Sequence, residues 1–181
     1  MQGSYDDVSD RLFSGESDGR DPLRIRPAAP WRLSEGEPVG QPLVWLTLDS
    51  LSTASPASCR HPEAPRLFVL DPTWLAREHP SLKRLAFIFE CLAEIEGVEV
   101  VQAAPSEAVP LTARRHGCRY VVVTSTTCPA TRQAAATIDA HLPVHVIDEP
   151  AFCDRSRVTD LGRFTRYWSK VSRSAMSHTR G

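Results

Sequence analysis

Short runs of apolar residues recur through the middle of the chain, and each run ends at a polar residue or a turn signal. The runs are rich in Val and Leu and are mostly continuous rather than alternating, which is typical of strands covered on both faces of a parallel sheet. We therefore predict five strands, at residues 43–50, 66–71, 98–103, 120–125 and 144–149.

A first helix is predicted over residues 81–97, between the second and third strands. Ser81 can cap its start, and Gly97 can take the left-handed conformation that ends many helices. Apolar residues recur in it at helical spacing, so one face should pack on the sheet. The predicted core face consists of Leu82, Leu85, Phe89 and Leu92.

Two more helices are predicted farther along the chain. Residues 106–116 form one of them, with a first turn made irregular by Pro110, and it stops at Gly117. Pro129 stands at a first helical position and opens the other helix, which runs to about His141.

Strand and helix alternate from residue 43 to residue 149. This order predicts an α/β fold, a Rossmann-like three-layer sandwich around a five-stranded parallel sheet. The stretch FTRYWSK at residues 164–170 adds a short C-terminal helix with its aromatic residues on one face. We predict that Phe164 and Trp168 pack against the sheet domain. The alternative is an exposed contact surface at residues 164–173 for self-association, an acidic partner or DNA.

The predicted α/β domain spans residues 43–173. Residues 1–42 contain five Gly and five Pro and no apolar period, so they are predicted to be a flexible extension, and residues 174–181 a tail. Residues 155–181 hold seven Arg and Lys and one acid, although the formal net charge of the chain is −1. This basic end favours a solvated tail, with contact to nucleic acid or to a partner as the alternative.

Cysteine usage and hydropathy bear on the compartment. The five cysteines show no C-x-x-C spacing, so we expect neither a disulfide framework nor a zinc ribbon, and we predict a reduced, cytoplasmic setting. No apolar stretch approaches the ~20 residues that span a bilayer, and the start MQGSYDD lacks the parts of a signal peptide. No membrane partner is therefore expected.

Candidate site residues lie where the strands end, because open parallel sheets bind ligands beyond the carboxyl ends of their strands. Neither G-x-G-x-x-G after the first strand nor G-x-x-x-x-G-K-[ST] occurs, which argues against dinucleotide and P-loop chemistry. The six histidines are scattered without metal-ligand spacing, so no metal site is predicted. The residues selected from the strand ends are Thr47, Asp49, Asp71, Ser125, Thr126 and Asp148.

These residues also have local interpretations. Asp49, Asp71 and Asp148 could converge on a metal or a ribose, but aspartate at strand ends is favoured for capping turns and helices alone. The hydroxyl groups of residues 124–127 could bind a phosphate at a helix start or could cap that helix. Cys128 could be acidified by the same helix start, yet the sequence identifies no base partner for it.

Four segments, taken in order, follow a known pattern. They are LVWLTLDS (43–50), RLFVLDP (66–72), the stretch 82–122 that begins LKRLAFIF, and FTRYWSK (164–170). In order and spacing they resemble the photolyase and cryptochrome family, which reads L-V-W-F-R-R-D-L-R in its first strand, V-F-V-L-D-P in its second, and F-T-P-F-W-K where its N-terminal domain ends. The resemblance covers roughly residues 43–173.

This resemblance implies the N-terminal α/β domain of a photolyase alone. In that family the aromatic segment leads into a helical domain that carries FAD, the electron-transfer tryptophans and the pocket for a flipped pyrimidine dimer. In many relatives the α/β domain holds an antenna pigment such as a folate, a deazaflavin or FMN. We therefore expect no FAD in this chain and no light-driven DNA repair by it alone.

The chain departs from the family pattern at the antenna site. Thr47 and Leu48 stand where the family has Arg-Arg, whereas Asp49 is kept. Residues 125–129 (STTCP) replace Asn-Arg-Asp-Tyr-Glu-Pro and are one position shorter, and the chain contains no asparagine. Arg132 keeps the family's basic residue on the following helix, so the resemblance adds it to the candidate cofactor-binding residues.

Three functions follow from these observations. The first is a stand-alone photolyase-type α/β domain, a non-catalytic module for a nucleotide-like or antenna ligand or for a protein partner. The second is part of a light-dependent DNA photolyase whose catalytic domain lies on another chain or is missing here. The third is a small nucleotide-binding α/β enzyme, although the chain lacks a phosphate-gripping loop.

Overall fold

The computed structural model describes residues 31–34, 36–154, 158 and 164–177. By its contacts the chain divides into two compact units, one of residues 29–150 and the other of the two end segments, 1–28 and 151–181. The predicted extension therefore lies largely outside the described residues.

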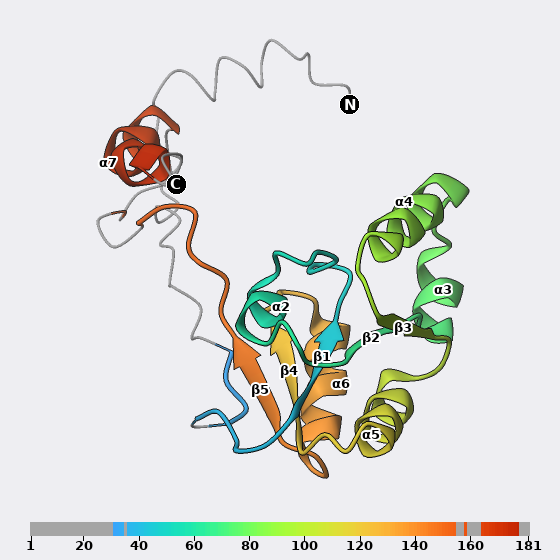
Figure 1. Cartoon of the computed structure of the whole chain (residues 1–181). Coiled ribbons are helices and arrows are strands. Elements are labelled where there is room, and N and C mark those ends of the chain that lie inside the picture. The colour runs from blue at the N-terminus through green and yellow to red at the C-terminus, as the bar shows by residue number, and fades with distance from the viewer. Residues whose placement is uncertain (1–30, 35, 155–157, 159–163, 178–181) are drawn as a thin grey trace, which may run out of the picture. The chain divides into compact units, whose positions relative to one another are not determined.

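Five strands form a fully parallel sheet in the unit of residues 29–150, as predicted (Figure 1). The strand order is β3-β2-β1-β4-β5, so β1 is central and the chain builds first one side of the sheet and then the other. The observed strands end earlier than predicted, because the polar residues after each apolar run lie in loops. Their bounds are β1 Pro42–Leu46, β2 Arg66–Val69, β3 Val98–Val101, β4 Tyr120–Thr124 and β5 Val144–Ile147.

Helices connect the strands and confirm the predicted α/β class (Figure 1). Three of them, α4 to α6, match the predicted helices, whereas the short helices α2 and α3 were not predicted. α3 begins with Asp71 as its cap and Pro72 in its first turn, a start signal like that at Pro129. The bounds are α2 Pro56–Arg60, α3 Pro72–Glu78, α4 Leu82–Ala93, α5 Pro105–Arg115, α6 Pro129–Asp139 and, in the other unit, α7 Phe164–Ser177.

Two apolar cores lie on the two faces of the sheet, which gives the predicted three layers. Along β1, Leu43 and Trp45 belong to one core, and Val44 and Leu46 belong to the other. The first core takes its helical residues from α5 and α6, and the second takes them from α2 and α4. Because both faces are covered, every residue of β1 and of β4 is buried.

The ends of the helices follow from local chemistry. The Ser81 Oγ accepts a hydrogen bond of 3.3 Å from the backbone N–H of Arg84, as expected of a capping residue. Gly97 and Gly117 have φ angles of 69° and 68°, in the left-handed region that favours glycine after a helix. Pro110 is accommodated inside α5.

The buried face of α4 differs from the predicted one. Ile88 and Leu92 are each 3% exposed, whereas Leu82 is 82% exposed and Phe89 is 47% exposed. The prediction is therefore wrong for Leu82 and Phe89. The physical reason is that α4 carries apolar residues on more than one side, so helical spacing alone does not determine which side packs on the sheet.

Residues 31–41 belong to the sheet unit. Trp31 and Leu33 pack against the core that α5 and α6 cover. The guanidinium of Arg132, on α6, lies 5.4 Å from the centroid of the Trp31 ring, in a cation–π contact. The compact unit thus begins before Leu43, where the sequence analysis places the domain boundary.

The helix α7 has a small core of its own. Val171 and Ala175 are buried together with Cys153. Phe164 is 70% exposed and Trp168 is 39% exposed, and their rings stack on each other with centroids 6.0 Å apart. These two rings are therefore not buried, contrary to the prediction.

Candidate functional site

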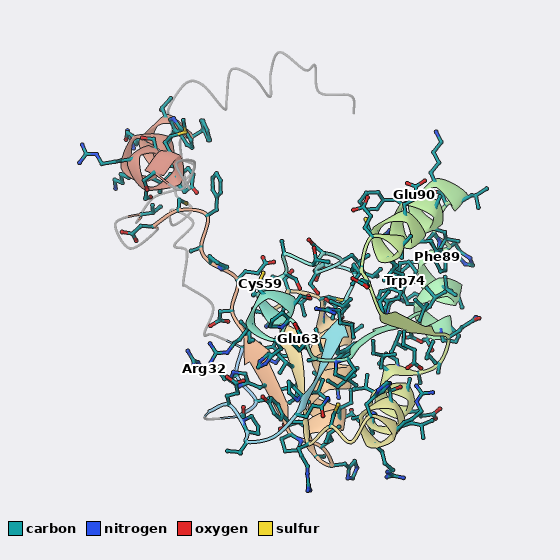
Figure 2. The ribbon with its side chains drawn as sticks, in the orientation of Figure 1. Arg32, Cys59, Glu63, Trp74, Phe89 and Glu90 are labelled. Carbon is teal, nitrogen blue, oxygen red and sulfur yellow. The ribbon has the colours of Figure 1, made fainter. Side chains whose placement is uncertain are left out.

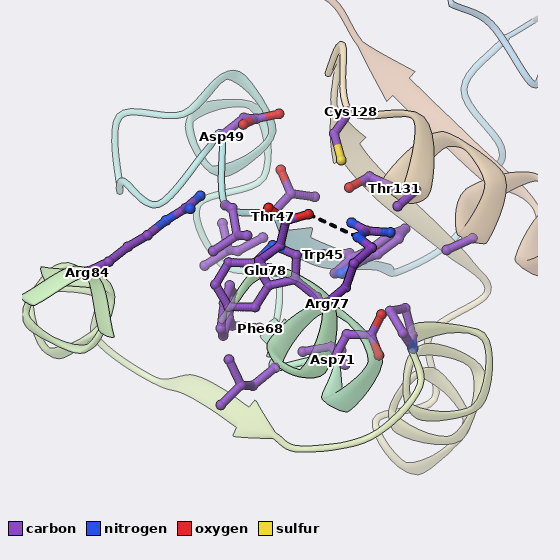
Figure 3. A pocket seen from close by; sticks show the side chains of 18 residues that line it. Trp45, Thr47, Asp49, Phe68, Asp71, Arg77, Glu78, Arg84, Cys128 and Thr131 are labelled. Atoms are coloured by element: carbon purple, nitrogen blue, oxygen red, sulfur yellow. Dashed lines mark hydrogen bonds and ion pairs between the residues drawn. The ribbon is translucent and has the colours of Figure 1, made fainter. Parts of the chain in front are cut away.

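A pocket of about 300 Å³ opens at the carboxyl ends of β1 and β2, beside the start of α6 (Figure 3). This place is the switch point of the sheet, because β2 lies on one side of β1 and β4, which leads into α6, lies on the other. Ligands of open α/β sheets bind at such a point, and the volume lies at the lower end of the range of small-molecule sites. The pocket is therefore the candidate ligand site.

The Trp74 ring and the Arg84 guanidinium form one wall of the pocket. Trp74 lies on α3 and is half-buried, whereas Trp45 of β1 and Phe68 of β2 are buried and belong to the cores on opposite faces of the sheet. The Arg84 guanidinium lies 5.3 Å from the centroid of the Trp74 ring. Figure 3 shows Arg84 reaching from α4 toward this wall. The face of the Trp74 ring is thus in contact with one planar group, the Arg84 guanidinium.

Most charged groups of the pocket are paired within the protein. The Arg77 Nε donates a hydrogen bond of 2.9 Å to Glu78 Oε1. The Asp71 carboxylate caps α3 by accepting a hydrogen bond of 2.8 Å from a backbone N–H, and the Thr126 hydroxyl donates to Asp49. Asp71 therefore caps α3, as the capping interpretation predicts, whereas Asp49 binds the loop that leads into α6.

Cys128 and Thr131 bring the start of α6 to the pocket. The Thr131 hydroxyl lowers the pKa of Cys128 together with backbone N–H groups of the first turn, although burial and the Asp49 carboxylate act in the opposite direction. A lowered pKa increases the fraction of the thiol that is ionised at a given pH. No histidine is among the described lining residues, so the pocket offers no imidazole base beside the thiol.

Three of the seven sequence-predicted site residues line the pocket, and four do not. Ser125 lies in the loop after β4, where its backbone N–H donates to the Ile147 carbonyl at 2.8 Å. Asp148 follows β5 and is exposed. The lining residues are Thr47, Asp49 and Asp71, whereas Ser125, Thr126, Arg132 and Asp148 lie outside the lining.

Two of the residues outside the lining hold the loop that leads into α6. The Thr126 Oγ1 accepts a hydrogen bond of 3.0 Å from the backbone N–H of Cys128 while its hydroxyl donates to Asp49. The Arg132 Nε donates a hydrogen bond of 2.6 Å to the Thr126 carbonyl. Thr126 and Arg132 therefore position Cys128 and Asp49 rather than contacting the pocket space themselves.

Sequence reasoning missed the residues that α3 and α4 contribute. Trp74, Arg77 and Glu78 lie on α3, which was not predicted, and Arg84 lies on α4. The Asp-Pro pair at residues 71–72 is a helix-start signal that could have revealed α3. The contact of Arg84 with the pocket depends on tertiary packing and has no local signal.

The pocket combines an aromatic surface with a few polar groups. The half-buried Trp74 ring offers a stacking surface, and the polar groups of the lining offer orienting hydrogen bonds. Among the described residues, no group of three or more His, Cys, Asp and Glu side chains could hold a metal ion. In the same part of the chain, no helix has both the length and the apolar character needed to cross a membrane.

A second polar cluster lies at the amino end of β4, around Glu37. The Glu37 carboxylate accepts hydrogen bonds from Arg60 at 2.6 and 2.9 Å and from the Tyr120 hydroxyl at 3.0 Å, and the His61 Nε2 lies 3.0 Å away. Burial raises the pKa of Glu37, but these hydrogen bonds and the neighbouring positive charges outweigh it and lower the pKa. Burial and the Glu37 carboxylate raise the pKa of Tyr120 to about 12. The cluster fastens residues 31–41 to the sheet.

Replacing Glu37 by glutamine should reduce both stability and its pH dependence. We expect Glu37→Gln to lower the free energy of unfolding by about 1–2 kcal/mol at neutral pH, because the charge-assisted hydrogen bonds are lost. Since the pKa of Glu37 is lowered by folding, the difference between the two proteins should be full above its ordinary value of 4.5 and shrink as the pH falls through the folded value.

Urea denaturation at a series of pH values measures this difference. The matched control is Glu63→Gln, because Glu63 is an exposed glutamate near the same helix and should contribute little. Equal pH dependence in Glu37→Gln and the wild type would show that the carboxylate does not stabilise the fold.

Neither the models of known protein families nor the curated proteins gave a match to this chain. Its function is therefore inferred from the geometry of the pocket and from the resemblance in sequence.

Proposed function

We propose that the sheet unit is a non-catalytic ligand-binding module whose pocket takes a planar heteroaromatic ligand. The observation that carries this proposal is the Trp74 ring, which is half-buried in the pocket wall and has the flat Arg84 guanidinium against its face. Stacking of a flat ring on an aromatic side chain contributes about 1–3 kcal/mol. A planar ligand can therefore stack on Trp74 and move the flexible, exposed Arg84 side chain aside.

The charges around the pocket favour an uncharged ring over a polyphosphate. The described lining carries the carboxylates Asp49, Asp71 and Glu78 against the guanidinium groups of Arg77 and Arg84, so it has no excess of positive charge. The sequence also lacks the two backbone motifs that cradle phosphates. These features disfavour a nucleoside triphosphate enzyme and favour the ring of a flavin, a deazaflavin or a folate.

The resemblance of residues 43–173 to the photolyase and cryptochrome family supports the same class of ligand. The α/β domain of that family holds an antenna pigment with such a ring. In this proposal the chain is an antenna-type domain, and light-driven DNA repair would require a separate domain that carries FAD. The fold alone does not decide between functions, because Rossmann-like sheets host many of them. The pocket wall is what distinguishes this chain.

Riboflavin titration tests the proposal. We expect the purified protein to quench riboflavin fluorescence with saturation, to bind ATP much more weakly, and to bind riboflavin about tenfold or more weakly in the Trp74→Ala variant. A protein that purifies with absorbance in the blue region would show directly that it retains a pigment.

The control is Trp168→Ala. This variant also removes one tryptophan, but Trp168 does not line the pocket. This variant should bind riboflavin as the wild type does. Absence of saturable binding in the wild type, or equal binding by the Trp74→Ala variant, would refute the proposed function.

A further inference from the structure

One side of α4 is an apolar stripe that no described part of the chain covers. Leu82, Ala86, Phe89 and Ala93 are all exposed, with Leu82 at 82% and Phe89 at 47%. They recur every three or four residues, so they share one side of the helix, different from the side that packs on the sheet. Two large apolar side chains exposed together on one helix indicate a contact surface.

Large and small residues alternate along this stripe. When a second α4 is laid antiparallel against the first, Leu82 comes opposite the partner's Ala93, and Phe89 comes opposite the partner's Ala86. Each large side chain then fills the space that a small one leaves, which is what close helix packing requires. A parallel pair would instead place each large side chain against its own copy. The stripe is therefore complementary to itself in the antiparallel orientation.

The charges beside the stripe favour the same orientation. Lys83 lies at the amino end of α4, whereas Glu90 and Glu94 lie at its carboxyl end, and their spacing of seven and four residues places all three on one flank. Figure 2 shows Glu90 and Phe89 on α4. In an antiparallel pair, Lys83 lies between the partner's Glu90 and the partner's Glu94, and two-fold symmetry makes this contact twice. A parallel two-fold pair would place this flank against the partner's other flank, so Lys83 would not meet the partner's Glu90 and the partner's Glu94.

We propose that the stripe on α4 is a homodimer interface, in which two copies of the chain pack their α4 helices antiparallel. α4 has 12 residues and is about 18 Å long, so the pair buries less than the roughly 1,600 Å² of a standard interface. The dimer is therefore weak and depends on concentration in the micromolar range. None of the stripe residues lines the pocket, so this interface does not depend on the proposed ligand.

Sedimentation equilibrium of the full chain over a range of concentrations tests the interface. We expect a monomer–dimer equilibrium whose dissociation constant rises about tenfold or more in the Phe89→Asp variant. The matched control is Leu111→Asp, because Leu111 is 66% exposed on α5 and lies outside the stripe. A protein that stays monomeric at all concentrations, or a dimer that Phe89→Asp leaves unchanged, overturns the proposal.

A second set of variants tests the orientation and separates this interface from association through α7. Lys83→Glu should weaken the dimer, and Lys83→Glu combined with Glu90→Lys and Glu94→Lys should restore it, because only the antiparallel pair regains opposite charges. Failure of the combined variant to restore the dimer refutes the antiparallel arrangement. Phe164→Asp should leave the dimer intact, and loss of the dimer in that variant assigns the association to the aromatic face of α7 instead.

Discussion

Leu67→Ala should lower the free energy of unfolding of the sheet unit by about 2–5 kcal/mol. Leu67 lies in β2, is 0% exposed, and belongs to the core that α5 and α6 cover. Removing its side chain leaves a cavity that the packed neighbours cannot fill completely, so both the burial and the contacts are lost. Because a domain of this size is stable by only about 5–15 kcal/mol, the loss is a large fraction of the total.

Urea denaturation followed by circular dichroism measures this loss. Leu111→Ala makes the same chemical change at a leucine that is 66% exposed on α5, and it should change stability by no more than about 0.5 kcal/mol. Equal losses in the two variants would mean that Leu67 does not lie in a packed core.

The strands could be predicted from sequence because burial on both faces requires a continuous run of apolar residues. In β4, Val121 to Val123 form a continuous apolar run, since each successive side chain enters one of the two cores. The side of α4 that faces the sheet has no comparable pattern in the sequence. Leu82, Phe89, Ile88 and Leu92 all suit a helix core, and only the contact with the sheet decides that the last two are buried.

The site could be predicted only in part for a similar reason. Thr47, Asp49 and Asp71 line the pocket because they follow strand ends, and the position of strand ends is set by the topology of parallel sheets. Trp74 and Arg84 lie on helices, and they meet only when α3 and α4 are folded onto the sheet. The switch point can therefore be located from sequence, whereas the chemistry of its wall cannot.

A chain that begins at Gln41 should be less stable than one that begins at Trp31 by about 3 kcal/mol or more. The shorter chain loses the partly buried Trp31 and Leu33 from the core. It also loses Glu37, the acceptor of the hydrogen bond from the Tyr120 hydroxyl. Exchanging such a hydrogen bond for one to water costs about 0.5–1.5 kcal/mol.

The same truncation should also weaken ligand binding in the pocket, because it removes the contact between Trp31 and Arg132. Trp31 lies against the Arg132 guanidinium, and the Arg132 Nε holds the carbonyl of Thr126, whose hydroxyl in turn donates to Asp49. We therefore expect Trp31→Ala in the full chain to lose part of the stability that the truncation removes and to weaken riboflavin binding by a few fold, whereas Glu37→Gln loses stability alone. Urea denaturation and the riboflavin titration measure the two effects. If Trp31→Ala and Glu37→Gln weakened riboflavin binding equally, the loss of binding would follow from a general loss of stability. The contacts from Trp31 through Arg132 to Thr126 would then not be its cause.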